Sequence, residues 1–169
     1  MIYKYSASDS RVGRVVRLLS DPYTELTCLF LQASMPLFDD VNRLLQKEEP
    51  LIHLIHDSLR QQLQRILMRF VKSSVVASSN CPTQIQYNDQ NNHKTDEDIF
   101  IGSAARDFIS GHTTELSSRI DQFHEEVKQF YIRACDYMIS KFPFDDDVLL
   151  NAKVVDISKR LEMSFHQIL

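Results

Sequence analysis

The stretch LIHLIHDSLRQQLQRILMRFV, from Leu51 to Val71, decides the fold of this chain. Its apolar residues recur every three or four positions, so they fall on one side of a helix. These residues are Ile52, Ile55, Leu59, Leu63, Ile66 and Phe70. At a rise of 1.5 Å per residue the helix is roughly 30 Å long, enough to span a small domain. An apolar stripe of this length requires partner helices, which the rest of the chain is expected to supply.

The composition is that of a globular protein in which helices predominate. Of the 169 residues 43% are hydrophobic, while only 3 are glycine and 5 are proline. The hydrophobic fraction allows a buried core, and the scarcity of turn-forming residues disfavours a many-stranded sandwich or barrel. We therefore predict one all-α domain over 1–169, an antiparallel bundle of about five to seven helices.

Charge, cysteine content and the N-terminal sequence exclude several classes of protein. The net charge of −4 does not call for a polyanionic partner. The three cysteines, Cys28, Cys81 and Cys135, contain no Cys-x-x-Cys pair, so a reducing intracellular compartment and no zinc motif are expected. The start, MIYKYSASDSRVGR, lacks the apolar core of a signal peptide, and no apolar run approaches the ~20 residues of a membrane span.

The same periodicity predicts helices on both sides of the central one. They are a helix from Ser8 or Asp9 to about Leu19, two helices or one bent helix from Tyr23 to Lys47 broken at Pro36, a short helix from Gly102–Ser103 to Gly111, a long helix from Thr113 or Thr114 to Ser140, and a last helix capped by Asp145. The inward residues of the first are Val12, Val15, Val16 and Leu19, and those of the last are Val148, Leu149, Ala152 and Val155.

Between the two long helices the sequence becomes polar. Residues 78–98 read SSNCPTQIQYNDQNNHKTDED, with many Asn, Gln and Asp and almost no apolar residues. Such a stretch is expected to bury too little area to offset the entropy of ordering it. We therefore predict one long disordered polar loop, a flexible segment over 77–99 inside the domain.

Two groups of cations are the candidate contact residues. They are Arg11, Arg14 and Arg17 on the first helix, and Arg60, Arg65, Arg69 and Lys72 on the central helix. Either group could bind phosphates or a protein partner. The more ordinary interpretation is that both are solvated faces of amphipathic helices.

Other residue types suggest chemistry less strongly. His53 and His56 are three apart, but zinc-binding helices use a spacing of four and a third ligand. Asp145, Asp146 and Asp147 could bind Mg²⁺, although helix capping explains them more simply. Cys135 has no identifiable base. We predict no catalytic, metal or cofactor site, no small-molecule substrate, and a protein that is not an enzyme.

The residues that lead from Pro36 into the central helix resemble those of a known protein family. MPLFDDVNRLLQKEEPLIH, from Met35 to His53, resembles a segment of animal proteins derived from hAT-type DNA transposases, as do Arg69–Lys72, Lys141–Pro143 with Tyr137, and Asp145–Asp146. The resemblance covers about Leu29 to Ile157 and skips the polar loop. It implies the helical insertion of the RNase H-like catalytic domain, as part of a larger transposase-like protein.

What the resemblance implies about function is limited. The family's three metal-binding acidic residues lie on the β-rich core that flanks the insertion, and no residue of this chain corresponds to them. The family's Cys-x-x-His element, tryptophan and BED finger are absent from this sequence. We therefore expect a catalytically inactive, transposable element-derived module in the nucleus. The first hypothesis is a structural or protein-interaction role, in which the partner is either the remaining transposase-like domains or a second copy of the chain. The second is an accessory nucleic-acid-binding module. The third is a Mg²⁺-dependent nuclease that uses Asp145–Asp147.

Overall fold

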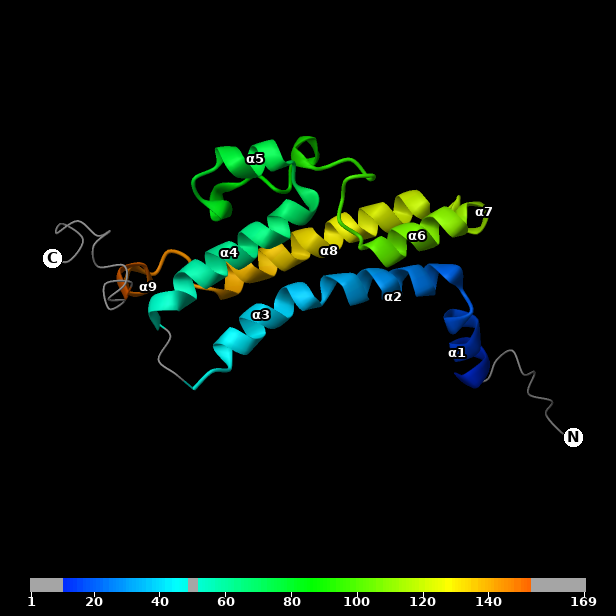
Figure 1. Ribbon diagram of the computed structural model, residues 1–169, viewed down its shortest axis with the longest axis horizontal. Helices are drawn as coiled ribbons and strands as arrows, with labels where there is room; N and C mark the ends of the chain where they lie inside the picture. The colour runs from blue at the N-terminus through cyan, green and yellow to red at the C-terminus, as the bar shows by residue number, and fades with distance from the viewer. Residues whose placement is uncertain (1–10, 49–51, 153–169) are drawn as a thin grey trace, which may run out of the picture. The chain divides into compact units, whose positions relative to one another are not determined.

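The computed structural model describes residues 11–48 and 52–152, and within these ranges the fold is all-α, as predicted (Figure 1). The described helices are α1 (Arg11–Leu19), α2 (Pro22–Ser34), α3 (Pro36–Leu45), α4 (Ile52–Phe70), α5 (Ser73–Ser78), α6 (Ser103–Gly111), α7 (Thr113–Leu116), α8 (Ile120–Lys141) and α9 (Asp147–Asn151), with two 3₁₀ helices, η1 (Pro82–Gln84) and η2 (Gln90–Asn92). Within the described residues there is no strand, and extended pairing is limited to a bridge between Val71 and His93. None of the described helices is both long and apolar enough to cross a membrane.

The contacts of the chain group into two compact units, where the sequence predicted one domain. Unit 1 comprises 1–35 and 101–127, and unit 2 comprises 36–100 and 128–169. Unit 1 therefore holds α1, α2, α6, α7 and the start of α8, while unit 2 holds α3, α4, α5, α9 and the rest of α8. The boundary between α2 and α3 falls at Pro36, where the sequence predicted a break.

Unit 1 is built on α2, which packs beside α6 (Figure 1). Asp21 caps α2, because its carboxylate accepts the backbone N–H of Tyr23 at 3.0 Å. Arg119 binds both oxygens of the same carboxylate at 3.1 and 2.9 Å, and its guanidinium lies 3.9 Å from the centre of the Tyr23 ring. Phe123 meets the rings of Tyr23 and Phe30 edge-on. The ion pair between Arg119 and Asp21 and the aromatic cluster around Phe123 thus stabilise unit 1.

Gly102 allows α6 to lie close to α2. Its φ of 90° is a conformation that residues with a side chain rarely adopt. A Cβ atom at this position would collide with the Cβ of Ala33. Only glycine therefore fits at the start of α6.

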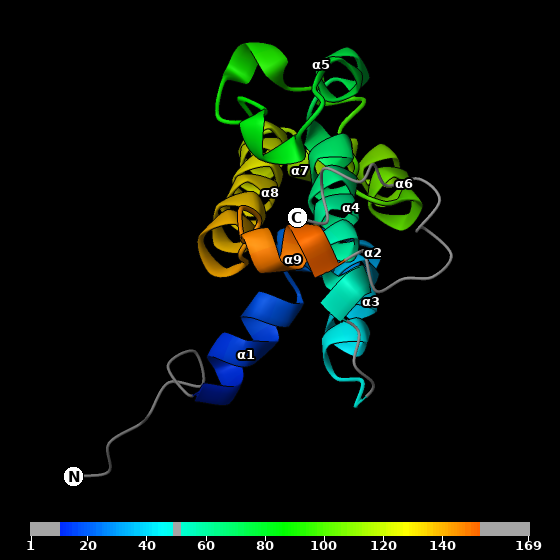
Figure 2. The same cartoon turned by 90° about the vertical axis from the view of Figure 1, so that its left-hand side faces the viewer.

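Unit 2 is built on α4, which is the helix predicted from 51–71; Leu51 lies outside the described residues. The second half of its predicted stripe is buried, namely Leu59, Leu63, Ile66 and Phe70. The N-terminal part is less covered, because Ile52 is exposed. Phe70 stacks on Tyr131 with ring centres 5.8 Å apart, and α9 packs against α4 (Figure 2). The stripe therefore forms the core of this unit, as its periodicity indicated.

The prediction of a flexible loop over 77–99 is wrong. The segment begins at the end of α5, contains η1 and η2, and buries Ile85, Tyr87, His93 and Ile99. Both views show it folded back over the end of α4 (Figures 1 and 2). Its backbone completes the helix terminus, since the N–H groups of Lys94 and Phe100 donate to the carbonyls of Phe70 and Arg69 at 2.7 and 2.9 Å.

Three smaller boundaries differ from prediction. The helix predicted from 113 to 140 is divided into α7 and α8 by a turn at 117–119, where the N–H of Arg119 donates to the carbonyl of Leu116. The cap of α9 is Asp146, one residue later than predicted, and Val148 is 67% exposed rather than inward. Val155, Ser8 and Asp9 lie outside the described residues.

Candidate functional site

The first basic helix, α1, exposes its apolar residues. Val12, Val15, Val16 and Leu19 fall on one side of the helix and are 71%, 53%, 55% and 70% exposed. The prediction that these residues face inward is therefore wrong. None of the nine residues of α1 is buried, so this side of the helix faces solvent.

The arginines of α1 lie apart from that stripe. Steps of 100° per residue place Arg14 and Arg17 on the side opposite Val16 and Leu19, with Arg11 at the edge. All three arginines are exposed, and α1 contains no acidic residue. The Nε of Arg17 donates to the carbonyl of Gly13 at 3.4 Å. This helix thus presents its apolar stripe on one side, and on the other the arginines together with Leu18, which is also exposed.

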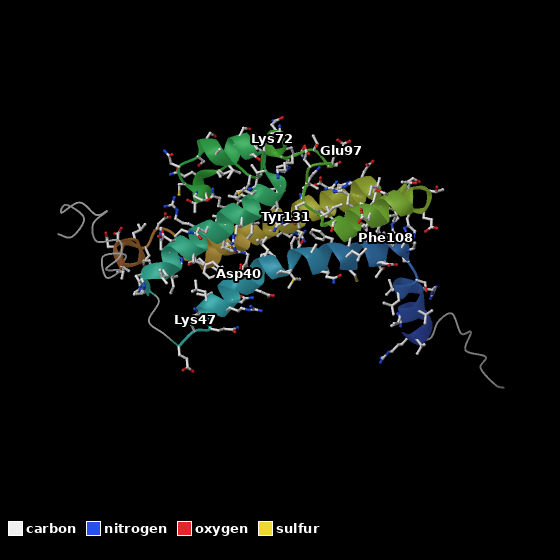
Figure 3. All side chains as sticks on the ribbon, in the orientation of Figure 1. Asp40, Lys47, Lys72, Glu97, Phe108 and Tyr131 are labelled. Carbon is white, nitrogen blue, oxygen red and sulfur yellow. The ribbon has the colours of Figure 1, made fainter. Side chains whose placement is uncertain are left out.

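The cations of the central helix have different surroundings. Arg60 donates to the carbonyl of Asn80 at 2.9 Å, and Lys72, labelled in Figure 3, donates to the carbonyl of Asn91 at 2.6 Å. The guanidinium of Arg69 lies 3.6 Å from the centre of the Phe100 ring. Arg60 and Arg69 attach the segment after α4 to the helix, whereas Lys72 lies just after the end of α4 and joins two parts of that segment, so all three serve the fold of unit 2.

Arg65 completes the set of predicted contact residues. Its Nη1 lies 2.9 Å from a carboxylate oxygen of Asp40 in α3, and both side chains are more than half exposed. An exposed pair of this kind contributes about 0–1 kcal/mol. The cations of α4 therefore do not form one free basic face.

A polar pocket of about 240 Å³ opens in unit 2 between α4, α5 and η1. Its charged lining residues are Asp57 and Arg60, and the rest of the wall is mostly amides, hydroxyls and short apolar side chains. No pattern in the sequence predicts this pocket, because its far wall belongs to the segment that was predicted to be disordered. An open pocket with one cation and one anion can hold a small polar group.

Cys81 lies in the chain segment that forms this wall. Partial burial acts to raise the pKa of its thiol, but hydrogen bonding with Thr83 and the positive charge of Arg60 outweigh that effect, so the pKa lies below its usual value. The Sγ atom is 3.1 Å from the hydroxyl of Thr83, which is no general base. Cys135 is buried, and this burial raises the pKa of its thiol to about 12.

The histidine and aspartate candidates have structural roles. His56 is buried, with its Nε2 3.2 Å from the carbonyl of Phe144, and its Nδ1 lies 3.6 Å from Asp57. Asp146 accepts the N–H groups of Val148 and Leu149 at the start of α9. Across residues 11–48 and 52–152, no three His, Cys, Asp or Glu side chains are grouped so that they could hold a metal ion.

Comparison with protein-family models, with curated proteins and with solved structures finds no match for this chain. The resemblance to hAT-type transposases therefore stays a prediction from the residues that carry it. The site must be argued from the geometry, in which α1 stands out because its apolar stripe and its three arginines are exposed on one helix.

Proposed function

We propose that this chain is a helical protein-interaction module, without catalysis of its own, that docks through α1. The observation that carries the proposal is the contrast between the buried stripe of α4 and the exposed stripe of α1, which Val12, Val15, Val16 and Leu19 form. A contiguous exposed apolar stripe marks a binding surface in many proteins, whereas scattered exposed residues do not. Derivation from a hAT-type transposase, and with it a nuclear location, belongs to the proposal and is supported by the residues between Met35 and His53.

The candidates for catalysis favour a structural interpretation. His56 faces a backbone carbonyl, Asp146 caps a helix and Cys135 is buried without a base, so each of these side chains has a role in the fold. The thiol of Cys81 contacts a hydroxyl rather than an imidazole. A module that holds or recruits another protein requires none of these groups.

Site-directed photocrosslinking tests the proposal. A photoreactive phenylalanine analogue replaces Val16 in one variant and Val148, which is 67% exposed on α9, in the control. We expect the variant at position 16, incubated in cell extract, to form discrete protein adducts that excess unlabelled chain competes away. Adducts of equal yield at both positions, or none at position 16, would contradict the proposal.

The second candidate is an accessory nucleic-acid-binding module that uses Arg11, Arg14 and Arg17. Exposure of all three on a helix without an acidic residue supports it. This role does not explain the apolar stripe of α1, because the phosphates of a nucleic acid provide no apolar surface against which the stripe could be buried. Binding to a DNA duplex that weakens about tenfold or more between low and moderate salt would favour this candidate.

A further inference from the structure

We propose that the polar pocket between α4, α5 and η1 binds a small zwitterion that carries both an ammonium and a carboxylate group, the simplest being an α-amino acid. The pocket lies wholly in unit 2, and its charged lining residues are Asp57 and Arg60. Its volume of about 240 Å³ is below the ~300–1,000 Å³ of pockets for drug-sized molecules, so the ligand is small. The inference goes beyond the interaction role of α1 and does not depend on it.

One polar side of α4 forms the floor of the pocket. Asp57, Arg60, Gln61 and Gln64 stand at positions i, i+3, i+4 and i+7, so they share a side of the helix. The opposite wall comes from the chain between 76 and 85. The polar side of an amphipathic helix ordinarily faces bulk water. Here it lines a cavity instead, and a molecule that enters meets both charges of the lining.

Arg60 is already held in place to receive a carboxylate. Its Nη2 donates to the backbone carbonyl of Asn80 at 2.9 Å, which joins the two walls of the pocket. A guanidinium has five N–H donors, so the remaining ones can bind a carboxylate through charge-assisted hydrogen bonds. Because the Asn80 contact orients the side chain before binding, less conformational entropy is lost when the ligand arrives.

Asp57 supplies the opposite charge one helical turn away. Its Oδ1 lies 3.6 Å from the Nδ1 of the buried His56, which is too long for a hydrogen bond. A carboxylate can accept about four hydrogen bonds, so a neighbouring partner still leaves capacity for an ammonium group. Side chains at i and i+3 begin about 5–6 Å apart. The ammonium and carboxylate of an α-amino acid flank a single carbon atom, so one ligand can reach both side chains.

The two opposite charges disfavour the other classes of small ligand. An anion such as phosphate would pair with Arg60 but be repelled by Asp57, and a simple cation would meet the reverse. A neutral molecule would displace water from both charged groups without offering either an opposite charge. A zwitterion satisfies both at once. The amides of Gln61 and Gln64 and the hydroxyl of Ser79 complete a wall that favours a polar ligand side chain, so L-glutamine is the probe.

The test is a titration of the ¹⁵N-labelled full chain followed by NMR. With L-glutamine we expect a Kd of about 1 mM or tighter, which a ligand of about ten non-hydrogen atoms reaches at ordinary binding energy per atom. The amide shifts should concentrate in 57–64 and 76–85. Two analogues each remove one charge: N-acetylglutamine lacks the ammonium, and glutaminamide lacks the carboxylate. Each should bind at least about fivefold more weakly than glutamine.

Substitutions of the two charged residues should affect the two analogues differently. Arg60→Gln should remove the preference for glutamine over glutaminamide, and Asp57→Asn the preference for glutamine over N-acetylglutamine. A general loss of structure cannot give this crossed pattern, because it weakens all three ligands alike. Arg60→Lys keeps the positive charge and should retain part of the preference that Arg60→Gln removes. Arg65→Gln, on the same helix but paired with Asp40 outside the pocket, is the matched control and should change the Kd by less than about twofold.

Several outcomes would overturn the inference. They are the absence of shifts up to about 20 mM glutamine, equal affinity for glutamine and both analogues, shifts that concentrate outside the pocket, and tighter binding of inorganic phosphate than of glutamine. Preferences that survive both Arg60→Gln and Asp57→Asn would also do so. If Arg60→Gln loses the dispersed spectrum of a folded chain, Asp57→Asn and Arg60→Lys decide the question in its place.

Discussion

The helices α1 and α4 have the same kind of sequence and different surroundings. Both are amphipathic and basic, and in both the apolar residues recur at helical spacing. In α4 the stripe is buried from Leu59 to Phe70, and two of its cations, Arg60 and Arg69, contact the segment that follows the helix. In α1 every apolar residue is exposed, and the Nε of Arg17 donates to the carbonyl of Gly13 in the same helix.

This difference shows what an amphipathic pattern determines. The periodicity fixes which residues share a side of the helix, but the cover over that side comes from elsewhere in the chain. For α4 the cover includes Tyr131, which is distant in sequence, and the segment up to Phe100, which follows the helix and folds back on it. A helix without such cover keeps the same pattern on an exposed side, which we propose is a binding surface in α1, and the following substitutions measure that difference.

The largest effect is expected in the core of α4. Phe70→Ala removes a ring that is fully buried and stacked on Tyr131, which should lower the free energy of unfolding of unit 2 by about 3–5 kcal/mol. The matched truncation in α1, Leu19→Ala, should cost less than about 0.5 kcal/mol. Urea unfolding followed by circular dichroism measures both, and equal losses would show that α1 is packed after all.

The next effect concerns Gly102 and tests whether unit 1 has a packed core of its own. Gly102→Ala forces a side chain into a positive-φ conformation and against Ala33, so we expect a loss of about 2–4 kcal/mol. Gly111→Ala at the end of α6 meets nothing within 4 Å and should be neutral or slightly stabilising. If the two variants unfold alike, the close packing of α6 on α2 is wrong.

The part of the fold that periodicity governs could be predicted, and the part that depends on distant contacts could not. The stripe of α4 and the break at Pro36 follow from residue spacing and from proline's missing N–H. The segment 77–99 was misjudged because few apolar residues suffice there; Tyr87 donates to Asp136 at 2.8 Å and the backbone caps α4. The pocket wall formed by this segment, with Cys81 beside it, was missed for the same reason.

A smaller effect is expected at Arg69, whose charge lies over the Phe100 ring. Arg69→Met keeps the aliphatic length and removes the cation–π contact, which should cost about 0.5–2 kcal/mol. Hydrogen exchange of the Phe100 amide should accelerate, because its N–H donates to the Arg69 carbonyl at 2.9 Å. Arg65→Met, which breaks only an exposed pair with Asp40, should leave that amide unchanged and serves as the control.

The smallest effect on stability is expected in α1, although the substitution there matters most for binding. Val and Ser have similar helix propensities, so Val16→Ser reports the burial of the side chain rather than a change in helix formation. We expect a change below about 0.5 kcal/mol, against about 1–3 kcal/mol for Val127→Ser, where the valine is 1% exposed in the same unit. Thermal unfolding of the two variants gives the comparison directly. A loss at position 16 as large as that at position 127 would mean that the stripe of α1 is a core surface, and the distinction between α1 and α4 would then disappear.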